Sequence, residues 1–213
     1  LGQNNGVSSP TRGIAGGSYI SPGAYVNTIE YVTIMSTGSF VEFGDLTTAR
    51  GRTGGIHNAT RGIFTDGFAP AVTNVIDYVT ISTTGNGVDF GDMIHGVRHS
   101  CGLQSQTRGV VPGGFSNQPG SNNISLIQYI TTSSFGNAAD FGDITISESL
   151  RGHGAGSNAI RGVYGGGIRW PSGVQAGLEY ITIATLGNGI SFGDLNYSSR
   201  LEGGGCASPT RGI

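Results

Sequence analysis

The sequence predicts an all-β protein built from copies of one four-stranded sheet, a β-propeller, and two series of repeated residues predict it. A segment that contains Tyr and ends in Phe-Gly-Asp occurs four times. Its tyrosines and its aspartates both step by 47, 51 and 51 residues: Tyr31, Tyr78, Tyr129 and Tyr180, and Asp45, Asp92, Asp143 and Asp194. The arginines of five RGI or RGV triplets step by 49, 47, 53 and 50 residues: Arg12, Arg61, Arg108, Arg161 and Arg211. Fixed periods of this length indicate a solenoid or a propeller.

Each repeat contains four segments that are typical of short strands. The first is rich in small residues, as in 51–59, and we expect it to pack closely. The second begins at the arginine of the triplet and pairs with the first across a short turn. A Gly- and Pro-rich loop that differs between repeats leads to the third, where Ile29, Tyr31 and Thr33 alternate with their neighbours. A glycine turn then leads to the fourth, which ends at Phe-Gly-Asp.

The repeats set the expected domain organisation. Four strands in about 50 residues are the signature of a propeller blade, and no repeat shows the 3.6-residue apolar period of a helical solenoid. We expect one domain, 1–213, with four complete blades and part of a fifth: 1–46, 50–93, 98–145, 151–196 and 200–213. Because Leu1 stands inside a repeat, we expect the chain to be a segment of a longer protein or a processed form.

Composition excludes several classes of protein. The 40 glycines among 213 residues have no three-residue period, which excludes collagen. The net charge of −2, from 13 acidic and 11 basic residues, lacks the basic surface of a nucleic-acid binder. No apolar run reaches the roughly 18 residues that span a bilayer, so no membrane insertion is expected. Cys101 and Cys206 fall at nearly corresponding positions two repeats apart, where a disulfide is not expected.

The order of these features resembles the kelch repeat along essentially the whole chain. The second strand ends in two glycines at Gly16-Gly17, Gly113-Gly114 and Gly165-Gly166, whereas the second repeat has Thr65-Asp66-Gly67. Phenylalanine (Phe43, Phe90, Phe141 and Phe192) stands where the kelch repeat has Trp. The strings PTRGI, YITI and FGD are also similar to repeats of virion structural proteins of marine tailed phages. These resemblances imply a kelch-like propeller and a place in a virus particle outside the cell.

The repeated charged residues are expected to be structural. A residue that recurs once per blade is scattered around a propeller, so the Phe-Gly-Asp aspartates should accept hydrogen bonds from turn N–H groups or pair with the triplet arginines. Those arginines could instead bind carbonyls of a neighbouring blade. The four histidines lack zinc-ligand spacing, no Gly-x-Ser-x-Gly motif is present, and no phosphate-binding loop is followed by Lys and Ser or Thr. We therefore predict no catalytic residue, no metal and no cofactor.

The candidate binding residues lie in two sets of loops. Aromatic residues gather between the second and third strands, and arginines lie between the fourth strand and the next blade. In kelch-type blades both loops emerge on one face, so the resemblance places these residues side by side. Rings next to arginines suit a sugar or a protein anchor, although such rings can also pack on their own blade. The candidates are Tyr19, Tyr25, Phe68, Phe115, Arg169, Trp170, Arg50, Arg98, Arg151 and Arg200.

The sequence thus predicts a non-enzymatic structural or binding module. We expect it to belong to a phage or virus particle, in a larger assembly, and to contact a host-surface glycan or a neighbouring virion protein. Two alternatives stay open. A cellular kelch-type interaction module would present a cluster of like charge, and a glycan-cleaving propeller enzyme would bring two carboxylates together across one substrate.

Overall fold

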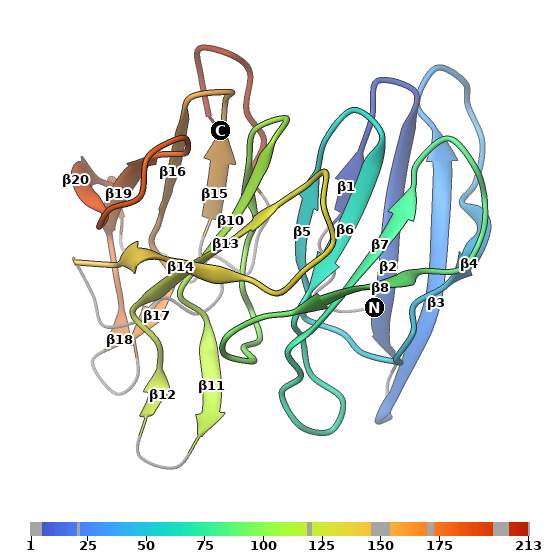
Figure 1. The fold of residues 1–213 in the computed structure, drawn as a ribbon, viewed down its shortest axis with the longest axis horizontal. Helices are drawn as coiled ribbons and strands as arrows, with labels where there is room; N and C mark the ends of the chain where they lie inside the picture. Colours follow the sequence, from blue (N-terminus) through green and yellow to red (C-terminus); the bar gives the residue numbers. More distant parts are fainter. Residues whose placement is uncertain are drawn as a thin grey trace.

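The computed structural model describes residues 6–20, 22–118, 121–145, 154–169, 173–197 and 205–212. Four four-stranded antiparallel sheets stand beside one another, from the N-terminal sheet to the C-terminal one (Figure 1). The first contains β1 (Gly6–Ser8), β2 (Arg12–Ile20), β3 (Ala24–Thr33) and β4 (Val41–Asp45). The second contains β5 (Gly54–His57), β6 (Arg61–Thr65), β7 (Val75–Thr80) and β8 (Val88–Asp92).

The third and fourth sheets have the same antiparallel strand order, with short hairpins inserted between their second and third long strands. The third contains β9 (Leu103–Gln104), β10 (Arg108–Pro112), β13 (Leu126–Thr131) and β14 (Ala139–Asp143), and the fourth β15 (Gly154–Ser157), β16 (Arg161–Gly165), β19 (Gly177–Thr182) and β20 (Ile190–Asp194). The inserted hairpins are β11 (Phe115–Gln118) with β12 (Ser121–Asn123), and β17 (Ile168–Arg169) with β18 (Gly173–Val174). The sequence predicted loops there. Pairing extends into them because antiparallel strands already bring the two ends of the connection together. Within the described residues no helix is present, and so none that could cross a membrane.

Phe-Gly-Asp forms a β-bulge at the same place in every sheet. In the first, Ile29 pairs with Gly44 and Glu30 with Glu42, which leaves Phe43 as the extra residue. The register shifts at the corresponding place in the other three sheets. The glycine beside the bulge has a positive φ, 157° at Gly44, which is a conformation that glycine adopts without a steric penalty. The motif therefore specifies a kink in the outer strand.

The hydrophobic core lies between adjacent sheets, in three clusters of the same pattern. One cluster packs Val7, Ile14, Ile29, Phe43 and Leu46 of the first sheet against Phe64, Val79 and Ile81 of the second. Equivalent clusters join the second sheet to the third and the third to the fourth. Each sheet is thus stabilised by burying apolar surface against its neighbour.

The small-residue strands lie next to one another along one side of the array, where β1 contacts β5, β5 contacts β9 and β9 contacts β15. The glycine of the RGI triplet faces the first strand of the preceding sheet. A Cβ on Gly62 would lie 2.6 Å from Val7, and one on Gly109 would lie 2.5 Å from Ile56. Because these distances are shorter than any real contact of a Cβ, the triplet needs glycine for the sheets to pack. This close packing agrees with the small residues of the sequence.

The triplet arginines join each sheet to the next one. Nη1 of Arg12 donates to the carbonyl of Ile81 at 2.9 Å, and Arg61 and Arg108 donate to Thr132 and Ile183, each at 2.8 Å. Each guanidinium also lies over the repeated tyrosine of its own sheet, 4.6 Å from the Tyr31 ring centroid for Arg12. The prediction of carbonyl partners in a neighbouring blade is confirmed.

The repeated aspartates do not pair with the triplet arginines, which was one of the two roles expected of them; Oδ1 of Asp143 accepts from the Ser125 hydroxyl at 3.1 Å. No described triplet arginine pairs with a Phe-Gly-Asp carboxylate, because carbonyls of the next sheet take the guanidinium donors. The side chains of Asp92, Asp143 and Asp194 are exposed. Their backbone carries the contact instead: the N–H groups of Asp45, Asp92 and Asp143 donate to Oδ1 of Asn86, Asn137 and Asn188 in the next sheet.

Candidate functional site

The connections between the second and third strands of the sheets gather at one end of the molecule, at the bottom of Figure 1. We call this end the loop face. The loops that follow the first and the second sheet reach it too, since the backbone of Gly51 pairs with Phe68 and that of Arg98 pairs with Phe115, each through two hydrogen bonds. The two loop types therefore meet, as the kelch resemblance implied.

Aromatic and arginine side chains of three sheets form one continuous row on the loop face. The Tyr19 and Tyr25 ring centroids lie 5.2 Å apart, and Tyr25 lies 5.7 Å from Phe68 of the next sheet, edge to face. Cζ of Arg98 stands 4.5 Å from the Phe68 ring centroid and 4.8 Å from that of Phe115. All five side chains are half-buried. We call Tyr19, Tyr25, Phe68, Arg98 and Phe115 the loop-face row.

Arg52 adds a second guanidinium to this row. Its Cζ lies 5.6 Å from the Phe68 ring centroid, and its buried Nε has no hydrogen-bond partner among the described residues. The side chain is half-buried, so the group is held against the ring while one donor is left unused. Sequence reasoning missed Arg52, although its place two residues after Arg50 was visible in the sequence.

Arg50 does not belong to the loop face, which corrects its place among the candidates. Its side chain is fully buried: Nη1 lies 2.8 Å from Oδ2 of Asp77, and Nε donates to the carbonyl of Asp66 at 2.9 Å. The backbone pairing shows that Arg98 corresponds to Gly51 and not to Arg50, whose place in the next loop is taken by the buried Val97. A buried, paired guanidinium cannot contact a ligand on the surface.

Four other candidates cannot be placed at the row. Trp170, Arg151 and Arg200 lie outside the described residues. The backbone of Arg169 is in β17, on the loop face of the fourth sheet, and the structure does not describe its side chain. The structure thus brings together Tyr19, Tyr25, Phe68, Phe115 and Arg98 of the predicted set.

Three residues with a strained backbone adjoin the row. Arg52, Asp66 and His99 have φ angles of 63°, 47° and 57°, and the N–H of His99 donates to the carbonyl of Arg52. In the other sheets, the place of Asp66 is taken by glycine: Gly17, Gly113 and Gly166. Positive φ in residues other than glycine costs free energy and is concentrated at functional sites. The sequence signals this strain, because the second repeat has Thr65-Asp66-Gly67 where the other repeats have two glycines.

Asp66 is an unusual carboxylic acid. Its side chain is fully buried, and the Ser100 hydroxyl donates to it at 2.8 Å and 3.0 Å. Burial disfavours the ionised form and raises the pKa of Asp66 to about 8, against the smaller lowering effects of Ser100, Arg50 and Thr65. The neighbouring Cys101 is buried as well, and burial together with the Asp66 charge raises the pKa of its thiol. The Asp66 carboxyl group, with a pKa of about 8, therefore changes charge near neutral pH.

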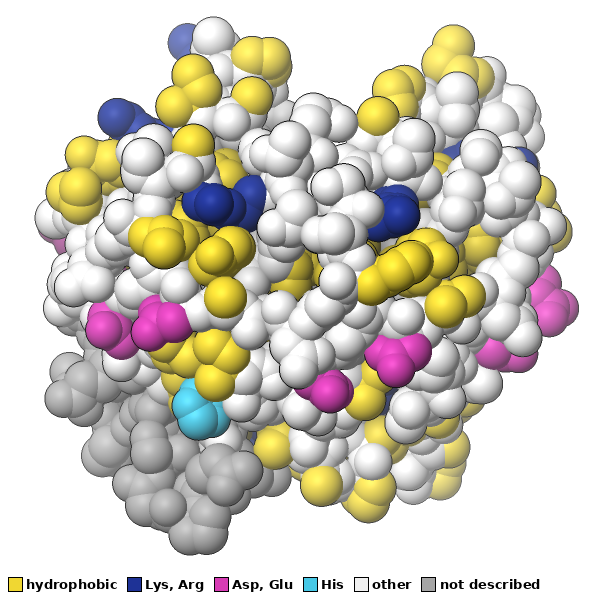
Figure 2. Space-filling view, viewed as in Figure 1, with side chains coloured by type: hydrophobic (Ala, Val, Ile, Leu, Met, Phe, Trp, Pro, Cys, Tyr) yellow, Lys and Arg dark blue, Asp and Glu magenta, His cyan; other side chains and the backbone are white. Residues whose placement is uncertain are grey.

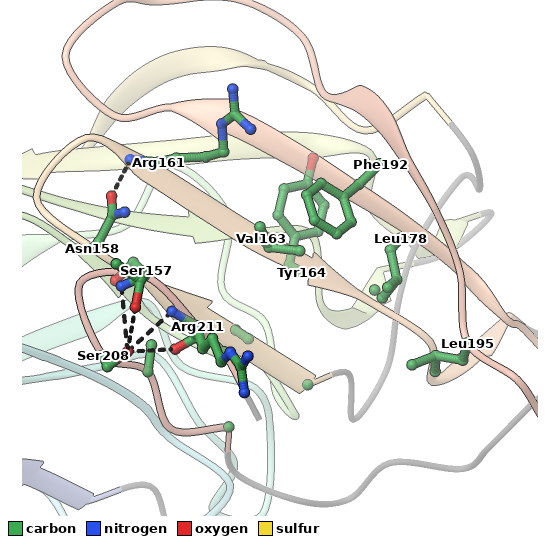
Figure 3. Close-up of a pocket in the computed structure, with 18 residues that line it drawn as sticks. Ser157, Asn158, Arg161, Val163, Tyr164, Leu178, Phe192, Leu195, Ser208 and Arg211 are labelled. Carbon is green, nitrogen blue, oxygen red and sulfur yellow. Dashed lines mark hydrogen bonds between the residues drawn. The ribbon is translucent and has the colours of Figure 1, made fainter.

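A concave surface lies on one side of the fourth sheet (Figure 3). It is a groove of about 550 Å³ between this sheet and the segment 205–212. Apolar side chains form one wall, with Val163, Leu178, Phe192 and Leu195 among them, and Ser208 and Arg211 belong to the other. These apolar residues correspond to Val110, Ile127, Phe141 and Ile144, which are buried between the third and fourth sheets. The groove is thus an uncovered sheet-to-sheet interface.

Charged groups are dispersed over the molecule. Acidic and basic side chains lie singly or in pairs on the face shown in Figure 2, without a large patch of one sign. Among the described residues, no group of three His, Cys, Asp or Glu side chains is placed to hold a metal ion. The Phe-Gly-Asp aspartates end the outermost strands of four different sheets.

Comparison with known proteins bears on the fold. No family model and no curated protein sequence matches this chain. Among solved structures, that of YjhT superposes with a TM-score of 0.75 at 11% sequence identity, over 96% of this chain and 73% of that one. The fold is a kelch-like β-propeller. The predicted all-β class and the four-stranded antiparallel blades are confirmed, and each sheet is a blade of this propeller. At this identity the likeness shows the fold alone.

Proposed function

We propose that this kelch-like propeller is a non-enzymatic binding module, and that the loop-face row binds a glycan. The observation that carries the proposal is the continuous row of half-buried rings and guanidinium groups contributed by three blades. A sugar ring offers C–H groups that stack on aromatic faces and hydroxyls that accept hydrogen bonds from arginine. A rigid propeller would hold these groups in place before the ligand binds, which lowers the entropic cost of binding.

The arginines favour an acidic sugar over a neutral one. Arg52 and Arg98 lie over the same Phe68 ring, and Nε of Arg52 has no partner within the described part of the chain. Guanidinium groups bind carboxylates through strong, charge-assisted hydrogen bonds, and a partly buried site strengthens them. The ligand class we propose is therefore a surface polysaccharide with carboxylate groups.

We further propose that the module belongs to a phage or virus particle. The support is the resemblance of the PTRGI, YITI and FGD strings to repeats of phage virion proteins. On a particle, the loop-face row would contact a host-surface glycan, or else a neighbouring virion protein. Antibodies against the purified chain, applied to particles in immunogold electron microscopy, test this location. Labelling of host cell contents without labelling of particles would reject it.

A glycan array with matched variants tests the binding function. Phe68→Ala and Tyr25→Ala each remove a stacking ring, and we expect binding of carboxylated glycans to weaken by about tenfold or more. Phe135→Ala is the control, because Phe135 is an exposed ring that also lies under an arginine, Arg61, but in the turn between β13 and β14, at the opposite end of its blade. Equal binding by all four proteins would reject the row as the site. Release of shortened products from a labelled polysaccharide would instead contradict the non-enzymatic assignment.

A further inference from the structure

Arg52 is a half-buried arginine whose side chain donates no hydrogen bond within the described residues. Its buried Nε has no partner, and its terminal nitrogens bond to no described carbonyl, hydroxyl or carboxylate. The half-buried arginines of the RGI and RGV triplets behave differently, since Arg12, Arg61 and Arg108 each donate from Nη1 to a carbonyl of the next blade. A guanidinium carries several N–H donors, so those of Arg52 are available to a ligand.

Arg52 also lacks a counter-charge. Within the described part of the chain, the ion pair is that of Arg50 with Asp77, and no acidic side chain pairs with Arg52. Its guanidinium lies over one ring, with Cζ 5.6 Å from the Phe68 centroid. Partial burial removes some of the hydration of this cation, so an anion bound beside it would be strongly attracted.

The backbone holds Arg52 in place before a ligand binds. Its φ of 63° is left-handed, and its carbonyl accepts the N–H of His99 at 3.1 Å. His99 occupies the corresponding place in the next loop, with φ of 57°, and its side chain is buried. A positive φ in a residue other than glycine costs free energy and is concentrated at functional sites. The first of these two loops thus carries a half-buried cation at the row where the second carries a buried histidine.

A second unused polar group lies next to the same loop. Ser18 is 9% exposed, and its buried hydroxyl has no partner among the described residues. Ser18 precedes Tyr19 of the row and adjoins Gly51, the residue before Arg52: a Cβ on Gly51 would lie 3.3 Å from the carbonyl carbon of Ser18. A buried hydroxyl without a hydrogen bond is costly, and each such group in a native structure needs an explanation.

The hydroxyl of Ser18 departs from the repeat. The corresponding residues of the other three sheets are glycines: Gly67, Gly114 and Gly167. Those glycines have φ angles of 83–123°, whereas Ser18 is not among the residues of positive φ. The backbone of the first blade therefore accepts a side chain at this turn, and the side chain that it carries is polar and unused.

We propose that Arg52 is the residue that selects acidic sugars on the loop face: its guanidinium binds the carboxylate of one sugar unit, and the Ser18 hydroxyl donates to the same group. The rings of Tyr25 and Phe68 stack on the sugar whether or not it is charged. Arg98, which lies over two rings of the row, belongs to the stack and not to this carboxylate subsite. The inference rests on the glycan-binding function proposed above and adds to it the place where charge is recognised.

The chemistry of the guanidinium gives this subsite its selectivity. A carboxylate matches the fork of an arginine with two parallel N–H···O bonds, and charge makes such bonds about twice as strong as neutral ones. A sugar hydroxyl accepts one neutral bond and leaves the half-buried cation uncompensated. The difference in affinity between an acidic glycan and its neutral counterpart should therefore depend on Arg52.

A glycan array of matched pairs tests this assignment. Each uronic-acid or sialic-acid glycan is printed beside the same glycan with its carboxyl groups reduced to alcohols. We expect the unmodified protein to bind the acid form about tenfold or more tightly than the reduced form, and Arg52→Gln to lower this ratio to about threefold or less. Tyr25→Ala should weaken binding of both forms alike, because stacking does not depend on the carboxylate. Binding of the reduced form by Arg52→Gln shows that the row is intact in this variant.

Arg161→Gln is the matched control for the loss of one positive charge. Arg161 is exposed at the start of β16 and lies 4.2 Å from the Tyr180 ring centroid, so it too is an arginine over a ring. Because it does not lie on the loop face, its substitution should leave the ratio of acid to reduced binding unchanged.

Ser18→Ala tests the hydroxyl by comparing binding with stability. Since the hydroxyl has no partner within the described residues, its removal should leave the urea midpoint of unfolding unchanged or slightly higher. Binding of the acid form should nevertheless weaken by about threefold. A lower midpoint together with unchanged binding would make Ser18 a structural residue and remove it from the subsite.

Two outcomes would overturn the inference while glycan binding stands. In the first, the unmodified protein binds both members of every pair equally. In the second, Arg52→Gln keeps the preference for the acid form and Arg98→Gln abolishes it. If neither form of any glycan binds, the binding function itself is rejected, and the carboxylate subsite with it.

Discussion

Arg50 and Asp77 form an ion pair of 2.8 Å in which both side chains are fully buried. The pair joins the loop after the first blade to the third strand of the second blade. Its remaining polar atoms are also satisfied, since Arg50 donates to the carbonyls of Asp66 and Phe64 and Asp77 accepts from Thr47. Buried charges require such partners, because removal of one leaves the other without compensation in a poorly solvated site.

Substitution of one member of this pair should destabilise the fold strongly. We expect Arg50→Met to lower the free energy of unfolding by about 3–5 kcal/mol, because Asp77 would stay buried without its counter-charge. Urea unfolding followed by tryptophan and tyrosine fluorescence measures the change. Arg211→Met is the control, since Arg211 is exposed, and it should change stability by less than about 0.5 kcal/mol. Similar decreases in the free energy of unfolding of the two variants would show that the ion pair does not stabilise the fold.

The turn between the third and fourth strands of one blade lies along the outer strand of the preceding blade: the N–H of Gly136 donates to the carbonyl of Phe90 at 2.9 Å, and that of Ala138 to the carbonyl of Asp92 at 2.8 Å. This contact, which we call the clasp, predicts a difference between two glycines of nearly equal backbone conformation. Gly91 and Gly193 have φ angles of 144° and 139°, so alanine at either position carries a similar backbone penalty. Only at Gly91 would the new Cβ also meet an atom, the Gly136 carbonyl oxygen at 2.5 Å. We expect Gly91→Ala to be less stable than Gly193→Ala by about 1–3 kcal/mol in urea unfolding. Equal losses would contradict the clasp.

The triplet arginines give a third prediction. Arg61 stacks on Tyr78 and Phe135, 5.2 Å from each ring centroid, and donates to the Thr132 carbonyl at 2.8 Å. We expect Arg61→Ala to destabilise the protein by about 2 kcal/mol, from one charge-assisted hydrogen bond and the cation–π contact together. Arg211→Ala, at the equivalent but exposed position after the fourth blade, should cost much less. If both variants unfold at the same urea concentration, the arginine does not join the blades.

Much of the fold could be predicted because the sequence repeats its local signals. The period of the tyrosines, aspartates and arginines predicted the number and order of the strands, and the arginine fork predicted a carbonyl partner. The role of Phe-Gly-Asp could not be predicted in the same way. Gly-Asn recurs at the turns, but its partner in the preceding blade, for Asn86, is the N–H of Asp45 some 41 residues away. Local sequence does not reveal such a register.

The site was predicted in part. Four of the predicted aromatic residues, Tyr19, Tyr25, Phe68 and Phe115, gather as expected because their loops leave one end of the blades. Arg50 was misplaced because the loops after the blades differ by one residue in their arginine position, and one residue separates the buried Arg50 from the surface position of Arg98. Arg52 and His99 were not singled out, since a positive φ in such residues results from tertiary packing and has no pattern in the sequence.

Asp66 makes stability depend on pH in the opposite sense to an ordinary ion-paired carboxylate. In the folded protein its pKa is raised from 3.8 to about 8, so the folded state keeps a proton that the unfolded chain releases above pH 4. The free energy of unfolding should therefore fall as the pH rises from about 4 to about 8, by up to about 1.4 kcal/mol per pH unit, and level off above that range. Urea midpoints measured from pH 5 to pH 9 give this slope. Asp66→Asn keeps the shape and tolerates the positive φ while it cannot ionise, so the slope should become nearly flat. An unchanged slope in this variant would assign the pH dependence to other groups.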